Sequence, residues 1–440
     1  MFSSLFIDYL FVISVILIWF MLGYQLLLFL LGFQYSRKSA KEKVEIRQAK
    51  LQLPNISIIV PAHNEALVIG ETLEAILASD FPEGQLEVIV VNDGSTDNTA
   101  AIVSSLARTD SRIKLINIPW EMGGRGKSAA LNVALRQARF EVIGVFDADN
   151  QPEPQSVRSL AEQLVGNPRL GAVIGKFRAA NKSENLLLRF LNIESLSFQW
   201  IVQAGRWMLL QFCTLPGTNF LVWKSILERL NGWDERALTE DAELTIRIYQ
   251  AGYQIKFVPY AVTWEQEPNA LKTWIRQRTR WVRGNNYILK KFVLQLFRSK
   301  PRSVALELLY SISLYYVFFL AILLSDVLFL LCITGLVFVP VPGPYSQVWI
   351  VAIILFFMEI VLALTLRSGK YSLFSATVPM IVLPGMRGSR GIPNGTKPAR
   401  RSFHDIRAKV NPGNRFRYLS PELIYSRHPA VHHPISAKLS

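Results

Sequence analysis

Residues 56–65 read ISIIVPAHNE, residues 87–95 read EVIVVNDGS and residues 142–149 read VIGVFDAD. Each segment is a short aliphatic run that ends abruptly in polar side chains, and residues 113–116 form a fourth run of the same kind. Such runs, alternating with helical stretches, are typical of parallel strands whose two faces are both covered by helices. The sequence therefore predicts an α/β domain with a doubly wound, mostly parallel sheet.

The polar residues stand where sheets of this class bind ligands. In open α/β sheets the ligand lies outside the carboxyl ends of the strands. Three predicted strands here end in His63-Asn64-Glu65, in Asn92–Ser95 and in Asp147–Asp149. We expect these three groups to meet at one edge of the sheet.

Long apolar runs flank this domain. Residues 5–33 carry Asp8 as their only charge, and the run is too long for the apolar core of a signal peptide. It is predicted to be a transmembrane helix. Six Lys and Arg residues follow between positions 37 and 50, and by the positive-inside rule they place the next domain in the cytoplasm.

The predicted organisation has six segments. They are a transmembrane helix (1–35), a basic cytoplasmic linker (36–53), the α/β domain (54–267), amphipathic interface helices (268–303), transmembrane helices (304–386) and a basic, disordered tail (387–440). As one helix, Val304–Pro340 would be about 55 Å long, so it is either two crossings or one long tilted helix. The pattern indicates a multi-pass protein of the plasma membrane.

Composition narrows the classes of site and partner. The formal charge of +15 is concentrated beside the first apolar run and in the tail, which favours anionic lipid headgroups over nucleic acid. His63 is the only histidine before the tail, and Cys213 and Cys332 lie far apart. This argues against a His-ligated or thiolate metal centre, so a metal in the domain is expected to be hard and oxygen-ligated.

Asp147 and Asp149 flank a small residue at a strand end. This spacing lets one carboxylate reach a nucleotide ribose and the other a divalent ion that bridges two phosphates. An ordinary polar turn with Asn150 and Pro152 is the alternative. Asp93 also follows a strand, where an Asx turn that caps a helix from Thr99 is compatible with ligand binding.

Residues 123–128 read GGRGKS, which invites comparison with a phosphate-binding P-loop. The spacing fails, because Glu121 stands where that pattern requires glycine. Lys127 is nevertheless predicted at a helix start, where it could support nucleotide binding, unless it is simply a solvated side chain. Thr239-Glu240-Asp241 precedes an amphipathic stretch, so Thr239 is predicted to be an N-cap with acids in the first helical turn.

Residues 277–281 read QRTRW. On a helix, Gln277, Arg280 and Trp281 share one face, so a cation and an aromatic ring are presented together. Arg can hold a diphosphate in a bidentate manner, and Trp can stack on a sugar face. An amphipathic helix at the lipid headgroup level is the alternative for an isolated copy of this motif.

Taken in order, these motifs resemble the membrane-embedded family 2 glycosyltransferases, which include the synthases of cellulose, hyaluronan and poly-N-acetylglucosamine. The resemblance spans residues 56–292 and implies a GT-A fold, inverting transfer from a UDP-sugar, and Mg²⁺ or Mn²⁺ as cofactor. It implies that Asp241 is the general base. The other implied residues are Pro61, His63, Glu65, Asp93, Lys127, Asp147, Asp149 and Arg280 for the UDP-sugar, Asp147 and Asp149 for the metal, and Gly217, Glu240, Gln277, Arg278 and Trp281 for the acceptor or product.

The sequence departs from the family pattern at Asn92, where Asp is often found, at His63, where Tyr is common, and in its tail, which has no Trp after Trp349. Within the family it looks most similar to bacterial poly-β-1,6-N-acetylglucosamine synthases. The expected product is a β-linked extracellular polysaccharide made from N-acetylglucosamine or glucose; the alternatives are transfer to a lipid acceptor and a non-catalytic assembly subunit. Expected partners are the donor, the acceptor, membrane lipids and export or assembly subunits, with no nucleic acid.

Overall fold

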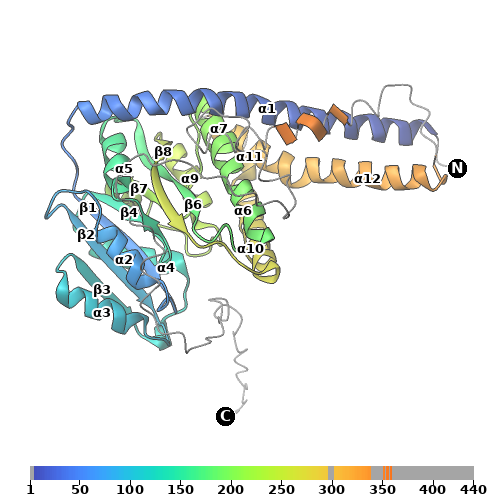
Figure 1. Ribbon diagram of the computed structural model, residues 1–440. Helices are drawn as coiled ribbons and strands as arrows, with labels where there is room; N and C mark the ends of the chain where they lie inside the picture. The colour runs from blue at the N-terminus through green and yellow to red at the C-terminus, as the bar shows by residue number, and fades with distance from the viewer. Residues whose placement is uncertain (1–3, 296–301, 338–349, 352, 356, 359–440) are drawn as a thin grey trace, which may run out of the picture. The chain divides into compact units, whose positions relative to one another are not determined.

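The computed structural model describes residues 4–295, 302–337, 350, 351, 353–355, 357 and 358. The prediction for the tail, and that of transmembrane helices for most of residues 338–386, lie outside these residues. The described part combines an eight-stranded sheet, helices on both of its faces and long apolar helices (Figure 1). The predicted fold class is therefore confirmed.

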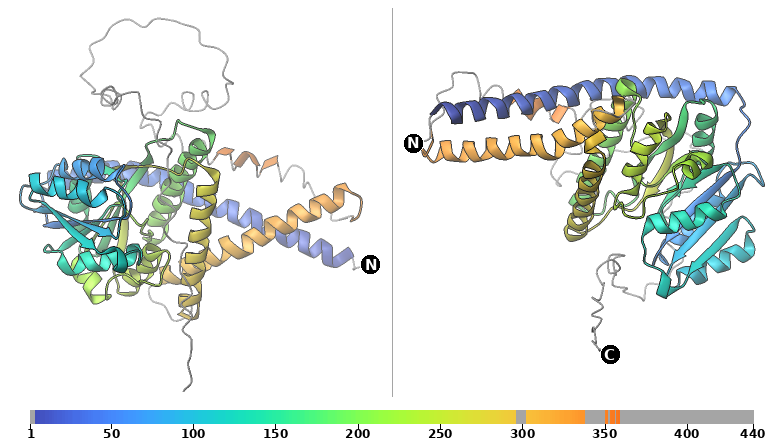
Figure 2. Two further views of the ribbon diagram at one scale, coloured as in Figure 1. Left: turned by 90° about the horizontal axis from the view of Figure 1, so that it is seen from below. Right: turned by 180° about the vertical axis from the view of Figure 1, so that it is seen from behind.

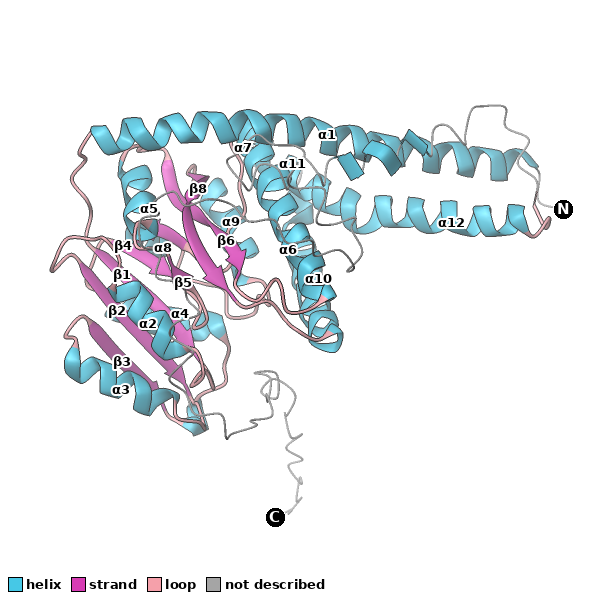
Figure 3. Cartoon of the chain, in the orientation of Figure 1, coloured by secondary structure: helices cyan, strands magenta, loops and turns pink. Residues whose placement is uncertain are grey.

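The four strands predicted from the sequence lie side by side and parallel. They are β1 (Ile56–Ala62), β2 (Leu86–Asp93), β3 (Ile113–Ile118) and β4 (Val142–Val145). β1 and β4 are central and buried, so their runs are mostly aliphatic. The carboxyl ends of β1, β2 and β4 consequently reach the same edge of the sheet (Figure 3).

The second half of the sheet is mixed. Its strands are β5 (Gln151–Pro152), β6 (Leu170–Ala179), β7 (Phe220–Trp223) and β8 (Gln254–Glu265), and the whole order is β3-β2-β1-β4-β7-β6-β8-β5. β7 runs antiparallel to β4 and β6, whereas β6 and β8 are parallel. This half brings the end of β8 close to the segment after β4, because β5 pairs with β8.

Short helices cover the sheet, and the three whose starts were predicted, from Thr99, at Lys127 and after Thr239, begin at those positions. The short helices are α2 (Ile69–Leu77), α3 (Thr99–Thr109), α4 (Lys127–Gln137), α5 (Ser156–Val165), α8 (Lys224–Arg229) and α9 (Glu240–Gln250), with a short 3-10 turn at Trp120–Met122. Asp97 accepts a hydrogen bond from the backbone N–H of Thr99 at 2.9 Å, which forms the expected Asx turn at the start of α3. The core is one aliphatic and aromatic cluster between these helices and the strands.

The first helix is longer than predicted. α1 runs from Ser4 to Gln48 without a break, so residues 36–48 are helical and not a linker. The sequence from 33 to 53 contains neither Gly nor Pro to end a helix. The basic half of α1 also docks on the domain, because Tyr35 donates to the carbonyl of Phe257, and Lys256 donates to Glu42 at 2.9 Å.

A second long helical segment crosses α1. It comprises α6 (Leu186–Ser197), a π-helical stretch (Phe198–Gln203) and α7 (Ala204–Leu210). A Cβ atom on Gly32 would lie 2.0 Å from the carbonyl oxygen of Trp200, and one on Gly205 would lie 2.2 Å from that of Leu28. The two backbones therefore touch, and only glycine fits at either position.

The remaining helices continue from the domain into the second apolar segment. They are α10 (Leu271–Phe292), a 3-10 turn (Val293–Gln295), α11 (Arg302–Ile312), a π-helical stretch (Ser313–Phe318) and α12 (Phe319–Ile333). Residues 302–332 form one helical run of 31 residues, about 46 Å long, so this part of the segment predicted at 304–340 is a single long helix. In the views of Figure 2, α12 and α1 cross and lie against one another. By length and composition, Leu5–Gln48 and Arg302–Cys332 are the two described helices that could span a membrane.

Candidate active site

The loops after β1 and β2 are tied together. The backbone N–H groups of Asn64 and Glu65 donate to the hydroxyls of Ser95 and Thr99, at 2.9 and 2.8 Å. The Nδ1 atom of His63 contacts the carbonyl oxygen of Asp93, while its Nε2 atom is buried without a partner in the described part of the chain. The polar groups at these two strand ends are thus held together, as the sequence predicts.

Asp93 holds a third loop against these two loops. Its carboxylate accepts a hydrogen bond from the N–H of Gly124 at 3.0 Å, and its side chain is buried. The loop approaches so closely that a Cβ on Gly123 would lie 2.7 Å from the Cα of Gly94. The glycines therefore allow the segment before α4 to close onto the end of β2, and they deliver Lys127 to the same edge.

Lys127 lies among three of the predicted groups. Its ammonium donates to the carboxylate of Asp147 and, at 2.9 Å, to the carbonyl of Gly217, and it lies 3.8 Å from Glu240. The N–H of Asp147 also donates to Thr218 at 2.9 Å. The segment after β4, the loop before β7 and the start of α9 are thus brought together around one cation.

Asp241 lies next to this group. A Cβ on Gly217, whose φ is +83°, would come within 3.2 Å of the Oδ2 atom of Asp241. Burial, and then the negative charge of Glu240, raise the pKa of Asp241 to about 7. A carboxylate with this pKa is suited to accept a proton near neutral pH.

The capping of α9 differs from the prediction. Thr239 occupies the N-cap position, but its side chain caps no backbone N–H, and its hydroxyl is buried without a partner in the described residues. The N–H of Ala242 is instead bound by Asp241 at 2.8 Å. The reason is packing, because Gly284 of α10 lies against Thr239, and a Cβ there would be 2.4 Å from its Oγ1 atom.

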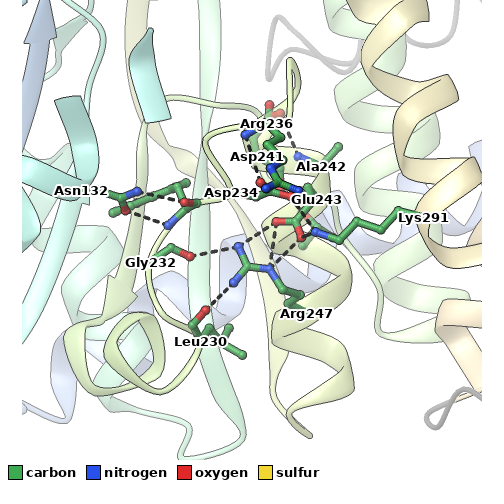
Figure 4. Close-up of polar contacts among 12 residues, drawn as sticks. Asn132, Leu230, Gly232, Asp234, Arg236, Asp241, Ala242, Glu243, Arg247 and Lys291 are labelled. Carbon is green, nitrogen blue, oxygen red and sulfur yellow. Dashed lines mark hydrogen bonds and ion pairs between the residues drawn. The ribbon is translucent and has the colours of Figure 1, made fainter. Parts of the chain in front are cut away.

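A charged network behind Asp241 holds α9 in place, and the sequence did not reveal it (Figure 4). Glu243 is completely buried and accepts hydrogen bonds from Arg247 and Lys291, at distances of 2.6 to 2.9 Å. Lys291 also pairs with Asp234 at 2.7 Å, and Arg247 donates to the carbonyl of Gly232. α9, α10 and the loop after α8 are therefore fixed to one another. Motif spacing could not show this, since the partners come together only through tertiary contacts.

More carboxylates converge at the site than the sequence indicated. Burial and the charge of Asp149 raise the pKa of Glu65 to about 8, and burial and Asp147 raise that of Asp149 to about 6. Burial, with Glu267 and Asp149 nearby, holds the pKa of Glu265 well above its usual range. Glu265 and Glu267 were not predicted; the available signal was their position at the end of a strand, just before Pro268.

These oxygen atoms fit a divalent cation held partly by substrate. The residues that the structure describes contain no cluster of three or more His, Cys, Asp or Glu side chains arranged to hold a metal. Asp147 and Asp149 nevertheless repel each other, and that repulsion would be relieved by a cation. Mg²⁺ typically binds to one or two carboxylates together with substrate phosphates.

The QRTRW motif lies on α10 beside this site. The Gly284–Thr239 contact places this helix against the residue that precedes Glu240. Arg278 pairs with Glu194 of α6 at 2.7 Å, and its guanidinium lies 4.3 Å from the ring centre of Trp281. Arg280 and Trp281 are exposed. The structure thus uses Arg278 to orient Trp281, while Arg280 and Trp281 remain accessible from solvent.

Comparison with known proteins gives one family. Residues 54–284 match the family described as "Glycosyltransferase like family 2". The probable glycosyltransferase YdaM of Bacillus subtilis is 42% identical over 361 residues, which cover 82% of this chain and 86% of that protein. A poly-beta-1,6-N-acetyl-D-glucosamine synthase of Staphylococcus epidermidis is 29% identical over 272 residues, 62% of this chain and 64% of that protein.

A similar solved structure is that of a mannosyltransferase from Pyrobaculum calidifontis in complex with GDP-Man and Mn²⁺. Its TM-score is 0.56 at 21% identity, and the alignment covers 82% of this chain and 99% of that one. At this level of identity the likeness concerns the fold, and it agrees with the predicted GT-A architecture.

Proposed function

The chain belongs to glycosyltransferase family 2, and we propose that it transfers a sugar from a UDP-sugar onto a growing β-linked polysaccharide at the membrane. One observation carries this proposal: Lys127 gathers Asp147, Gly217 and Glu240 around its ammonium, with Asp241 beside Gly217. A candidate base (Asp241), a cation that can bind phosphate (Lys127) and two carboxylates that can bind a metal (Asp147 and Asp149) thus share one site. N-acetylglucosamine and glucose are the proposed sugars, and the similarity to a poly-beta-1,6-N-acetyl-D-glucosamine synthase supports the first.

In the proposed reaction, Asp241 accepts the proton of the acceptor hydroxyl. The hydroxyl oxygen forms a bond to the anomeric carbon as the bond from that carbon to the diphosphate breaks, which inverts the configuration and releases UDP. Arg280 and Lys127 present positive charge to the leaving diphosphate. Asp147 and Asp149 would hold Mg²⁺ or Mn²⁺, which when bound neutralises further diphosphate charge.

The remaining site residues divide into two groups. Pro61, His63, Glu65 and Asp93 form the donor side, with Asp93 directed at the nucleoside. On the acceptor side, Trp281 offers a face on which a sugar can stack. Gly217, Glu240, Gln277 and Arg278 complete this second group.

Transfer to a lipid acceptor is the second candidate. Its support is the surface of α10, where Leu271, Ile275 and Val282 are exposed among several Lys and Arg residues. An amphipathic surface of this composition suits the level of lipid headgroups. We further propose that α1 and residues 302–333 anchor the chain in the plasma membrane, with the catalytic domain in the cytoplasm and with export or assembly subunits as further partners.

The test is transfer by the full-length chain in membranes or nanodiscs that are supplied with labelled UDP-sugars. Asp241→Asn is expected to lower transfer about 10²- to 10⁴-fold while UDP binding persists, because the base is lost and the donor contacts remain. Glu228→Gln, on an α8 side chain that is 58% exposed, is the control and should behave like the unaltered chain. Full activity of Asp241→Asn would show that Asp241 is not the base. The size of the labelled product distinguishes a polymer from a glycolipid.

A further inference from the structure

Lys127 forms an ion pair with Asp147, one of the two carboxylates that the proposed function assigns to the divalent cation. Its ammonium lies against Asp147 and also donates to the carbonyl of Gly217 at 2.9 Å. The position is well fixed, because Lys127 is the first residue of α4 and follows Gly126, which has a φ of +95°. Its side chain is only 27% exposed, so water screens this ion pair incompletely.

An ammonium and a divalent cation compete for Asp147. Both are positive, and both are attracted to the same carboxylate, so the presence of one disfavours the other. Asp149, the second proposed ligand, has no ion pair with Lys127, although the positive charge of Lys127 acts on it from nearby. Two carboxylates with a cationic side chain already among them form a weak site for free Mg²⁺ or Mn²⁺.

The surroundings of Lys127 offer its ammonium other anions. Glu240 lies 3.8 Å away on the first turn of α9, and its side chain is 12% exposed. The diphosphate of the proposed donor would supply further oxygens on the same side of the site. Lys127 can thus leave Asp147 without losing a negatively charged partner.

We propose that Lys127 is the counter-ion of Asp147 in the donor-free protein. A divalent cation then binds tightly only when the Lys127 ammonium pairs with a nucleotide diphosphate and leaves the Asp147 carboxylate. This inference rests on the proposed function. It requires positive coupling between cation and nucleotide, and by linkage each must raise the affinity for the other by the same factor. The strength of this coupling is then set by one side chain of the protein.

The test measures Mn²⁺ binding by electron paramagnetic resonance on the full chain in nanodiscs, with and without UDP. Without UDP, Lys127→Gln is expected to bind Mn²⁺ about 10-fold more tightly than the unaltered chain, and the gain in affinity on adding UDP should shrink. Lys127→Arg keeps the charge and should bind Mn²⁺ weakly without UDP. Lys114→Gln, on an exposed side chain of β3, removes the same charge elsewhere and should change neither quantity.

The outcomes separate the two proposals. If Lys127→Gln, with an unchanged melting temperature, binds Mn²⁺ no more tightly than the unaltered chain, the counter-ion role is overturned. An equal gain in Lys114→Gln would also overturn it, because the effect would then be general electrostatics. If no UDP-sugar is turned over but Lys127→Gln still binds Mn²⁺ more tightly, the counter-ion role stands and the proposed function is wrong.

Discussion

At the scale of single residues, the pKa of Asp241 gives a prediction for rate against pH. Burial and Glu240 raise this pKa to about 7, and only the deprotonated carboxylate can accept a proton. Transfer should therefore fall as pH drops below about 7 and level off above it. The measurement is kcat/KM for the sugar donor at saturating acceptor.

Glu240→Gln is the matched variant for this pH profile. It removes the neighbouring negative charge, so the midpoint should move to lower pH. A midpoint that stays in place would show that Glu240 does not set the pKa. A rate that is constant down to about pH 5 would exclude Asp241 as the titrating base.

Sequence was sufficient for those residues whose position follows from one element. Asp93 and Asp147 stand at the ends of aliphatic strands, so local pattern placed them at the edge of the sheet. The role of Asp241, in the first turn of a helix, was implied only by the family resemblance. Glu265 could not be found in this way, since its meaning depends on the pairing of β8 with β5, which is distant in sequence. Glu243 is one of several acids in the first turn of α9, and its role depends on a contact with Lys291, which is distant in sequence.

At the scale of elements, the crossing of α1 with the α6–α7 segment predicts a large effect of one methyl-bearing side chain. Gly32→Val would force atoms into the carbonyl of Trp200, 2.0 Å from the Cβ position. Overpacking usually costs about 1–3 kcal/mol, and backbone contacts allow little relief. The melting temperature of the detergent-solubilised chain should therefore fall by several degrees.

Gly23→Val is the control on the same helix, because a Cβ at Gly23 meets no atom within 4 Å. Its melting temperature should remain close to that of the unaltered chain. Equal losses from both substitutions would point to a general effect of valine on α1 and would contradict the role of the crossing.

The extent of α1 shows why element boundaries were harder to predict than element types. The apolar run indicated a helix correctly. The absence of Gly and Pro from the basic residues after it allowed that helix to continue but did not require it. Docking decides it: Glu42 reaches Lys256, which also donates to Gln163 at 2.8 Å. The same holds for residues 302–332, where length allowed one helix or two and tertiary contacts with α1 accompany the single helix.

At the scale of the whole molecule, fold class followed from the alternation of buried strands with helices, because this pattern is distributed over the chain. The mixed half of the sheet did not follow, since β6, β7 and β8 pair across long separations with both parallel and antiparallel neighbours. It is this half that brings Glu265 and α10 to the site predicted from the other half. The meeting of the predicted strand-end residues was therefore expected, but the addition of Glu265 and α10 to the same site was not.

The convergence of acids predicts how the stability of the whole fold depends on pH. Glu65, Asp149 and Asp241 have pKa values raised to about 8, 6 and 7, so between roughly pH 5 and 7.5 the folded state binds more protons than the unfolded state. Stability then decreases as pH rises through this window. Carboxylates with lowered pKa, such as Asp234 at about 2, lose their contribution only at more acidic pH and do not oppose this trend.

The melting temperature of the cation-free chain should consequently be lower at about pH 7.5 than at about pH 5.5. Mn²⁺ together with UDP should raise the melting temperature more at the higher pH, because protons no longer compete for the carboxylates. Asp149→Asn is the matched variant, and it should flatten the pH dependence, since it removes one of the titrating acids and the largest charge acting on Glu65. A melting temperature that rises with pH over this window in the unaltered, cation-free chain would mean that these carboxylates do not share one low-dielectric pocket, and the site built around Lys127 would have to be redrawn.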